Sequence, residues 1–147
     1  MSAAFDVRRM VPHDAEGASE LLAQLGYPTT ASDLEARIRG ASAANVEAVV
    51  AENADGLLLG LASMHRLPLL TADSPLALLT SVVVEQQARG LGVGRRMVEH
   101  LCARALELGC ERIAVMTHLR RSDAHSFYER LGFQFTGRRY VRVLAAP

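Results

Sequence analysis

The 147-residue sequence contains no lysine, and all 16 of its basic residues are arginine. Because 16 acidic residues balance them, the formal net charge is zero, and the chain has no excess charge to attract nucleic acid or an anionic membrane. A Walker A phosphate loop is also excluded, since that loop needs its lysine. We therefore expect neither a nucleic acid nor a membrane as a partner.

Cysteine and long apolar runs are scarce as well. Cys102 and Cys110 lack CxxC spacing, so we predict two reduced core thiols, and the five histidines lack the HExxH or HxxxH spacing of a metal site. The start of the chain lacks the apolar segment of a secretion signal, and no run approaches the roughly 18 apolar residues that span a bilayer. We expect a cytoplasmic protein without a bound metal.

The composition that remains is that of an ordinary globular protein. Half of the residues are apolar and 22% are charged, and the length is that of one domain, so we predict a single domain over residues 1–147. Helical and strand patterns alternate and indicate a mixed sheet with helices packed on it. Ser32 and Glu35 have the spacing of a capping box. The predicted strands are Phe5–Val11, Val46–Glu52, Leu57–Arg66, Leu76–Val84, Arg112–Thr117 and Phe133–Val143, and the predicted helices contain Ala18–Leu25, Leu34–Ile38, Gly94–Leu108 and Asp123–Leu131.

The most informative segment is a glycine-rich turn between a buried strand and an amphipathic helix. Gly90, Gly92 and Gly94 allow close backbone approach and positive φ, and the first amides of the helix have no acceptor within it. This geometry favours a phosphate group, whose charge Arg89, Arg95 and Arg96 could neutralise. A tight turn that binds nothing has the same pattern. A dinucleotide fingerprint is disfavoured, because its sixth position is Arg95 instead of glycine.

Two motifs resemble the GNAT superfamily of N-acetyltransferases. The run from Gln87 to Gly92 is similar to its Q/R-x-x-G-x-G/A motif, and the run from Ala124 to Phe133 to its A-x-x-F-Y-x-x-x-G-F signature. The resemblance implies a mostly antiparallel central sheet of six to seven strands, helices on both faces, and acetyl-CoA as cosubstrate. It assigns the coenzyme to Val82, Val83, Val84, Gln87, Arg89, Gly90, Leu91, Gly92, Val93, Gly94 and Arg95. Val82 and Val84 would contact pantetheine through the main chain, and residues 89–95 would hold the phosphates.

Tyr128 is the candidate catalytic residue. A phenol stays protonated at neutral pH and can give its proton to a leaving thiolate, and the resemblance implies a tyrosine near the coenzyme sulfur. Tyr128 also belongs to an apolar stripe at helical spacing, which alone predicts a core residue. We therefore predict direct attack by an amine on acetyl-CoA, with Tyr128 as general acid.

The general base is less evident. Many family members carry a glutamate on the fourth strand, whereas the strand Leu76–Val84 has only Thr80 and Ser81 as polar residues. His65, His118 and Glu85 are candidates, and a water chain or capture of neutral amine from solution is equally open.

The sequence does not name the acceptor amine. The resemblance implies a groove shaped by Gly26, Tyr27, Pro28 and the segment Arg138–Tyr140, open to a small molecule or a peptide. Arg121 stands where many members have a coenzyme-binding asparagine. The stretch Gln134–Val143 could pair across a two-fold axis and give a homodimer. A noncatalytic acyl-CoA-binding or sensing domain is the alternative function.

Overall fold

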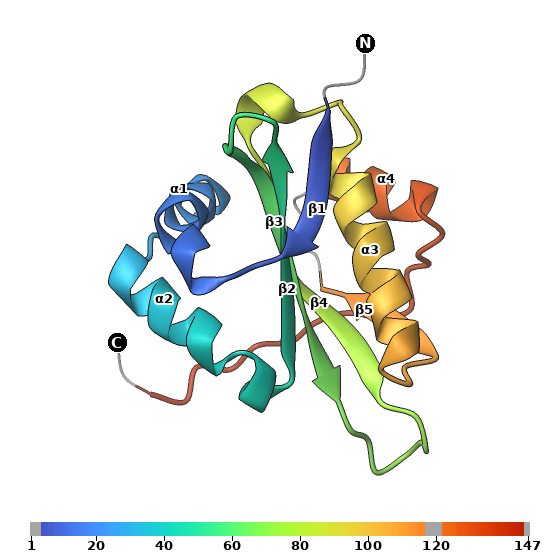
Figure 1. Cartoon of the computed structure of the whole chain (residues 1–147). Coiled ribbons are helices and arrows are strands. Elements are labelled where there is room, and N and C mark those ends of the chain that lie inside the picture. The colour runs from blue at the N-terminus through green and yellow to red at the C-terminus, as the bar shows by residue number, and fades with distance from the viewer. Residues whose placement is uncertain (1–3, 117–121, 146–147) are drawn as a thin grey trace. The chain divides into compact units, whose positions relative to one another are not determined.

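A computed structural model describes residues 4–116 and 122–145. The chain forms two compact units, Met1–Val115 and Met116–Pro147. The first unit contains a sheet in the order β1-β2-β3-β4-β5 together with helices α1, α2 and α3, and the second contains α4 (Figure 1). The single domain expected from the sequence stays a prediction.

The elements follow the predicted order as far as the last helix. The strands are β1 (Phe5–Arg9), β2 (Val46–Asn53), β3 (Leu58–Leu67), β4 (Leu76–Val84) and β5 (Arg112–Val115). The α-helices are α1 (Ala15–Leu25), α2 (Ala31–Gly40), α3 (Val93–Glu107) and α4 (Ser122–Arg130), and the 3-10 helices are η1 (Pro12–Asp14), η2 (Ser42–Ala44) and η3 (Gln86–Ala88).

The sheet is mixed and mostly antiparallel, as predicted. β1, β2, β3 and β4 pair antiparallel in sequence, and only β4 and β5 are parallel, with α3 as the connection between them. The described residues form five strands, whereas six to seven were expected, because 133–143 form no strand. An alternating pattern can predict that a segment suits a sheet, but a strand also needs a hydrogen-bonded neighbour.

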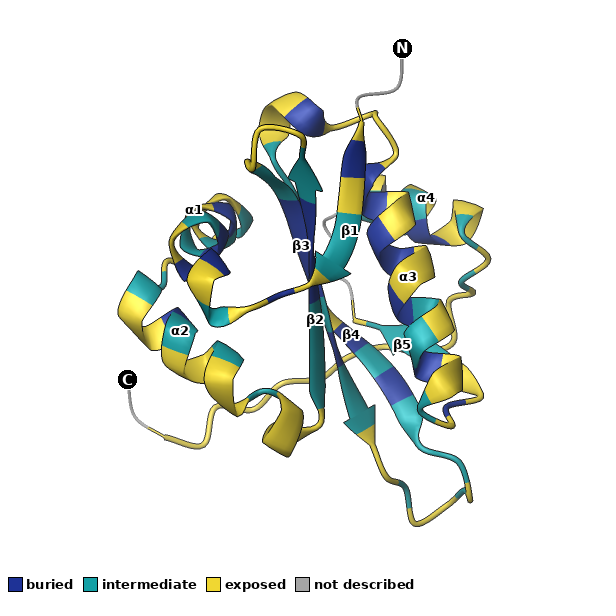
Figure 2. Cartoon of the chain, viewed as in Figure 1, coloured by how far each residue is buried: buried dark blue, intermediate teal, exposed yellow. Residues whose placement is uncertain are grey.

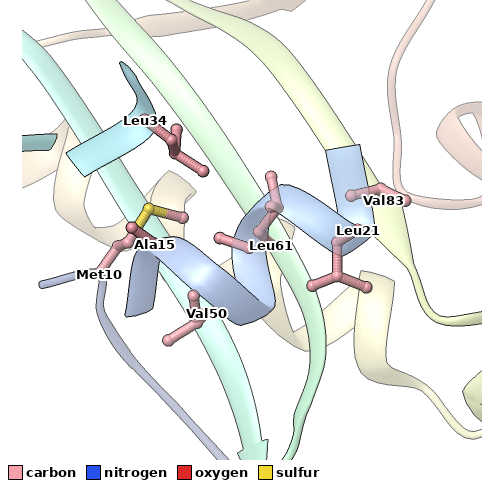
Figure 3. Packing of buried hydrophobic residues seen from close by; sticks show 8 residues of the cluster. Met10, Ala15, Leu21, Leu34, Val50, Leu61 and Val83 are labelled. Carbon is pink, nitrogen blue, oxygen red and sulfur yellow. The ribbon is translucent and has the colours of Figure 1, made fainter. Parts of the chain in front are cut away.

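Helices cover both faces of the sheet in the first unit. α1 and α2 lie on one face and α3 lies on the other (Figure 1). Buried residues line the inner sides of these layers, while the outer sides of the helices are exposed (Figure 2). Under α1 and α2 the core cluster consists of Met10, Ala15, Ala18, Leu21, Leu34, Val50, Leu61 and Val83 (Figure 3). Burying each of its larger side chains contributes about 1.5–3 kcal/mol to folding.

The start of α3 sits unusually close to β3. A Cβ atom on Gly60 would lie 2.8 Å from the end of Met97, 2.9 Å from the carbonyl oxygen of Val83 and 3.2 Å from Val93. Only glycine leaves room for this approach, and the carbonyl belongs to the backbone of β4 and cannot easily move. Gly60 thereby determines how closely the first turn of α3 packs against the sheet.

Two smaller expectations, on a helix cap and on the cysteines, can be compared with the structure. The cap of α2 lies two residues before the proposed capping box, because the hydroxyl of Thr30, not that of Ser32, accepts from the amide of Asp33 at 3.1 Å. Cys102 and Cys110 are free thiols, and burial raises the pKa of each. Among the described residues, no helix is both long and apolar enough to span a membrane.

Candidate functional site

The glycine-rich turn connects the end of β4 to the start of α3. η3 follows β4, and Gly90 and Gly92 then take φ values of +81° and +82°, in the left-handed region that favours glycine. A Cβ added to either residue would meet, among the described residues beyond its chain neighbours, no atom within 4 Å. The backbone conformation therefore demands glycine here, and the space above the turn is open.

The first turn of α3 has no acceptor of its own for its amides. Gly92 is the cap residue and offers no side chain, no acidic residue stands in the first turn, and the amide of Arg96 is bonded to Gly92 oxygen at 3.1 Å. The amides of the preceding residues have no intrahelical acceptor, and they carry the positive end of the helix dipole. This helix start suits an anion.

The outer edge of β4 is open in its second half. Pairing with β5 runs from Leu76↔Arg112 only to Leu79↔Val115, so within the described part of Met1–Val115 residues 80–84 have β3 as their one strand neighbour. The amide of Glu85 donates to Leu59 oxygen at 2.8 Å, which fixes the direction of alternate residues. The main-chain groups of Val83 therefore face β3, and those of Val82 and Val84 face the open edge.

Of the three arginines expected at the phosphates, two have protein partners elsewhere. Arg95 pairs with Glu99 at 2.9 Å along the surface of α3, and Arg96 donates to Phe5 oxygen at 2.8 Å with its guanidinium 4.3 Å from the Phe5 ring centroid. Arg89 is exposed and contacts Val84 oxygen at 3.4 Å. Of these three arginines, it is the one that contacts β4.

A hollow of about 490 Å³ lies on the β1 side of the turn. The acidic residues Asp6 and Glu52 line it beside Arg96 and Leu91. Two acidic groups make this hollow a poor phosphate site. We therefore place no coenzyme phosphate there.

A bulge in β4 gathers four polar side chains on one face of the sheet. Ser63 pairs with Ser81 and Met64 with Leu79, which leaves Thr80 as an extra residue. The hydroxyl of Thr80 lies 3.1 Å from Ser63 Oγ and 3.2 Å from His65 Nδ1, and Ser63 Oγ also contacts Ser81 Oγ. We call Ser63, His65, Thr80 and Ser81 the bulge cluster. It joins one predicted base candidate to the two polar residues of β4.

The other base candidates have different surroundings. Glu85 accepts from the amide of Gln87 at 2.7 Å and so caps η3. His118 lies outside the described residues, as do Arg120 and Arg121. Among the residues expected to shape the acceptor groove, Tyr27 is exposed and follows α1. Residues Arg138–Tyr140 are exposed in the second unit.

Tyr128 lies on α4 in the second unit and is 9% exposed. Its ring makes edge contacts with Phe127, at 5.0 Å between centroids, and with Phe133, at 5.5 Å. The amides of Leu131 and Phe133 both donate to its carbonyl oxygen at 3.0 Å, where Gly132 turns the chain with a φ of +90°. The second motif therefore folds as a helix end that holds the Tyr128 ring in a fixed aromatic environment.

One buried charged group has a structural role. Asp14, 6% exposed, accepts two hydrogen bonds from Arg8 at 2.8 and 2.9 Å and one from the amide of Val11 at 2.7 Å. Burial acts to raise the pKa of Asp14, but the bonds from Arg8 and Val11 outweigh it, so the pKa is lowered overall. The carboxylate ties η1 and the start of α1 to β1.

Sequence reasoning missed two residues of this region. Gly60 seats α3 on the sheet, and an isolated glycine inside a strand was the signal for such a close approach. Ser63 stands at the centre of the bulge cluster. No pattern in the sequence marks it, because its partners are set by the register of β3 on β4.

Comparison with known proteins identifies the family. The chain matches the acetyltransferase (GNAT) family over residues 17–133. It therefore belongs to this family of acetyltransferases, which confirms the resemblance seen in the two motifs. It is an acyltransferase that uses acetyl-CoA as cosubstrate.

The chain is also similar to individual acetyltransferases. The chain is 28% identical to an aminoglycoside N(6')-acetyltransferase type 1 of Stenotrophomonas maltophilia over 145 residues, which cover 96% of this chain and 94% of that one. It is 33% identical over 64 residues to a 5-NmdU N-acetyltransferase of Pseudomonas phage PaMx11, a match that spans 44% of either protein. Its fold is that of AAC(6')-Iy, solved in complex with the bisubstrate analog CoA-S-monomethyl-acetylneamine, with a TM-score of 0.83 and 22% identity over 97% of this chain and 99% of that one.

Proposed function

We propose that the chain transfers the acetyl group of acetyl-CoA to a primary amine of a small molecule or a peptide. The observation that carries this proposal is the combination at the end of β4: an open strand edge, a turn with two left-handed glycines, and a helix start without a side-chain cap. Membership of the family makes acetyl-CoA the cosubstrate, and these three features suit the diphosphate and the pantetheine arm of the coenzyme.

Each part of the coenzyme has a matching group on the chain. The amides between Gly90 and Gly94 would donate to the diphosphate, as the helix dipole and the room above Gly90 and Gly92 favour. Main-chain groups of Val82 and Val84 would pair with the amides of the pantetheine arm, as a neighbouring strand would. Arg89, next to the open edge, would add positive charge.

The reaction makes one bond and breaks another. The amine nitrogen bonds to the thioester carbonyl carbon, the carbon–sulfur bond breaks, the nitrogen loses a proton and the sulfur gains one. We assign the proton for sulfur to the hydroxyl of Tyr128, because a phenol keeps its proton at neutral pH. The aromatic contacts of its ring with Phe127 and Phe133 would hold the hydroxyl in one orientation.

The acceptor that we favour is the amine of a small, polar molecule. Support comes from the relative named as an aminoglycoside N-acetyltransferase, which this chain matches over nearly the whole length of both. Exposed residues such as Tyr27, in the connection between α1 and α2, would shape the groove. We expect this reaction to take place in the cytoplasm.

We also propose that the chain is a homodimer. Residues 134–145 are exposed and carry large apolar side chains, among them Phe135 at 74% and Leu144 at 89% exposure. Such a run of exposed apolar residues is costly in water and suits pairing with a second copy. Light scattering after size exclusion should give twice the mass of one chain, and a single-chain mass would contradict the proposal.

The proposed reaction is tested by a panel of amines, assayed for release of free thiol from acetyl-CoA. Aminoglycosides, simple diamines and N-terminal peptides should be included, and we expect turnover with at least one member. Binding of coenzyme A without turnover by any amine would favour the noncatalytic sensing domain instead.

The same assay tests Tyr128. We expect Tyr128→Phe to lower kcat about 100-fold with little change in KM for acetyl-CoA, because the general acid acts only in the chemical step. A melting curve of Tyr128→Phe serves as the control, since it shows whether the variant is as stably folded as the wild type. Normal kcat in Tyr128→Phe would refute the assignment.

A further inference from the structure

The bulge cluster lies at the point of β4 where the side chains become polar, the strand bulges and the pairing with β5 ends. The core residues Leu61 and Val83 are buried under α1, but the next residues along the same face, Ser63 and Ser81, are polar and only partly buried. The bulge at Thr80 follows, and pairing with β5 ends one residue earlier, at Leu79. The open edge of β4 thus begins at the bulge cluster.

The bulge also changes which side chains share a face. In a regular strand Thr80 and Ser81 would point to opposite faces, but here both hydroxyls contact Ser63. His65, two residues from Ser63 on β3, joins the same face and lies 3.2 Å from Thr80. The result is a continuous hydrogen-bonded chain from Ser81 through Ser63 and Thr80 to an imidazole.

The members of this hydrogen-bonded series differ in solvent exposure. Thr80 is an exposed residue, whereas His65 is partly buried. An imidazole is the one side-chain type in the cluster that can accept a proton near neutral pH, and a hydroxyl can pass one on. The carboxylate of Glu85, the nearest acid along the chain, is already bonded to the amide of Gln87.

We propose that His65, acting through Thr80, takes the proton that the acceptor amine loses. This inference rests on the acetyl transfer proposed above. With its own proton on Nε2, His65 accepts at Nδ1 from Thr80 Oγ1, so a lone pair of that oxygen faces the amine. As nitrogen bonds to the acetyl carbon, its proton moves to Thr80 Oγ1, the hydroxyl proton moves to His65 Nδ1, and the Nε2 proton leaves to solvent. Thr80 touches the amine, and His65 positions and deprotonates Thr80.

The test uses paired variants of each residue in the full chain. His65→Asn keeps an acceptor near Nδ1 but cannot take a proton, so we expect kcat to fall about 100-fold with little change in KM for acetyl-CoA. Added imidazole should restore about tenfold of the loss. Thr80→Val, which lacks the hydroxyl, should lose about tenfold or more, whereas Thr80→Ser should stay within about threefold of the wild type. His100→Asn, on the exposed surface of α3, is the matched control.

The outcomes separate this inference from the function on which it rests. If the wild type turns over an amine and His65→Asn has the same kcat, His65 is only a structural partner of Thr80 and the inference is overturned. A fall in kcat that imidazole does not relieve, with Thr80→Val as active as Thr80→Ser, also overturns it. If the wild type binds coenzyme A but acetylates no amine, the proposed function itself fails. Melting curves of each variant identify any loss that comes from unfolding.

Discussion

The starts of α2 and α3 are built in opposite ways. At α2 the hydroxyl of Thr30 accepts from the amide of Asp33, and Asp33 adds a negative charge to the first turn. At α3 the cap is Gly92, with no side chain, no acid follows, and Arg95 and Arg96 stand in the first turn. The start of α2 bonds one of its free amides with its own cap side chain, while the start of α3 leaves its first amides for an anion from outside. The uncapped start of α3 therefore indicates an anion-binding turn more strongly than the glycines do, because a glycine-rich turn can also connect a strand to a helix without binding a ligand.

The largest effect on coenzyme binding should come from giving α3 an anion of its own. Gly92→Asp places a carboxylate beside the open amides, so we expect the Kd for coenzyme A to rise about 100-fold, or about 2.7 kcal/mol. Gly92→Asn is the matched control, because asparagine tolerates positive φ and adds no charge, and it should lose about tenfold. Calorimetry measures both, and equal losses in the two variants would mean that charge is not the cause.

A second substitution disturbs the packing of α3 against the sheet at Gly60. In Gly60→Ala the new methyl would press on the carbonyl of Val83, so we expect a loss of up to about 3 kcal/mol in the free energy of unfolding. Coenzyme binding should weaken as well, because the first turn of α3 shifts. Urea unfolding gives the stability. Gly40→Ala, where a Cβ would meet nothing within 4 Å, should not destabilise the chain.

The start of α1 is a third case, because its cap residue, Asp14, makes no side-chain bond to the helix amides and binds Arg8 and the amide of Val11 instead. Asp14→Asn should lower the free energy of unfolding by about 2 kcal/mol at pH 7 and leave coenzyme binding unchanged. The pKa of Asp14 is lowered in the folded chain, so its contribution is complete above the unfolded value near 3.9 and is lost as the pH falls through the folded value. Urea unfolding from pH 7 to about pH 3 should therefore show the two proteins converging in acid. A constant gap would contradict this account.

The smallest effect belongs to the cap of α2. Thr30→Ala should cost about 1 kcal/mol in stability, the usual value for a lost cap, without changing the Kd for coenzyme A. Thr30→Ser, which keeps the hydroxyl, should restore most of the loss. Weaker coenzyme binding in Thr30→Ala would show that the two helix starts are coupled after all.

Much of this arrangement could be predicted from the sequence because local patterns determine it. The apolar stripe of α3 and the apolar run of β4 gave bounds within about one residue of those observed, and Gly90 and Gly92 have the positive φ that the turn required. The family followed from two motifs, and the match over residues 17–133 confirms it.

What could not be predicted depends on how distant segments meet. The bulge at Thr80 arises from the register of β4 on β3, and no spacing within either strand reveals that His65 lies beside Thr80. The partner of Arg96 was missed for the same reason, since Phe5 is ninety-one residues from Arg96 along the chain, whereas the Arg95–Glu99 pair lies within one helix. The strand expected at 133–143 failed because alternation of apolar residues does not supply a neighbouring strand.

The central claim is that main-chain amides of residues 90–94 hold the diphosphate of coenzyme A. Amide NMR of the labelled protein tests it most directly, with coenzyme A and pantetheine added in turn. We predict that coenzyme A shifts the resonances of Gly90, Leu91, Gly92, Val93 and Gly94, while pantetheine, which lacks the diphosphate, shifts Val82 and Val84 but leaves those five unchanged. If coenzyme A binds and the five amides do not respond, the account is wrong.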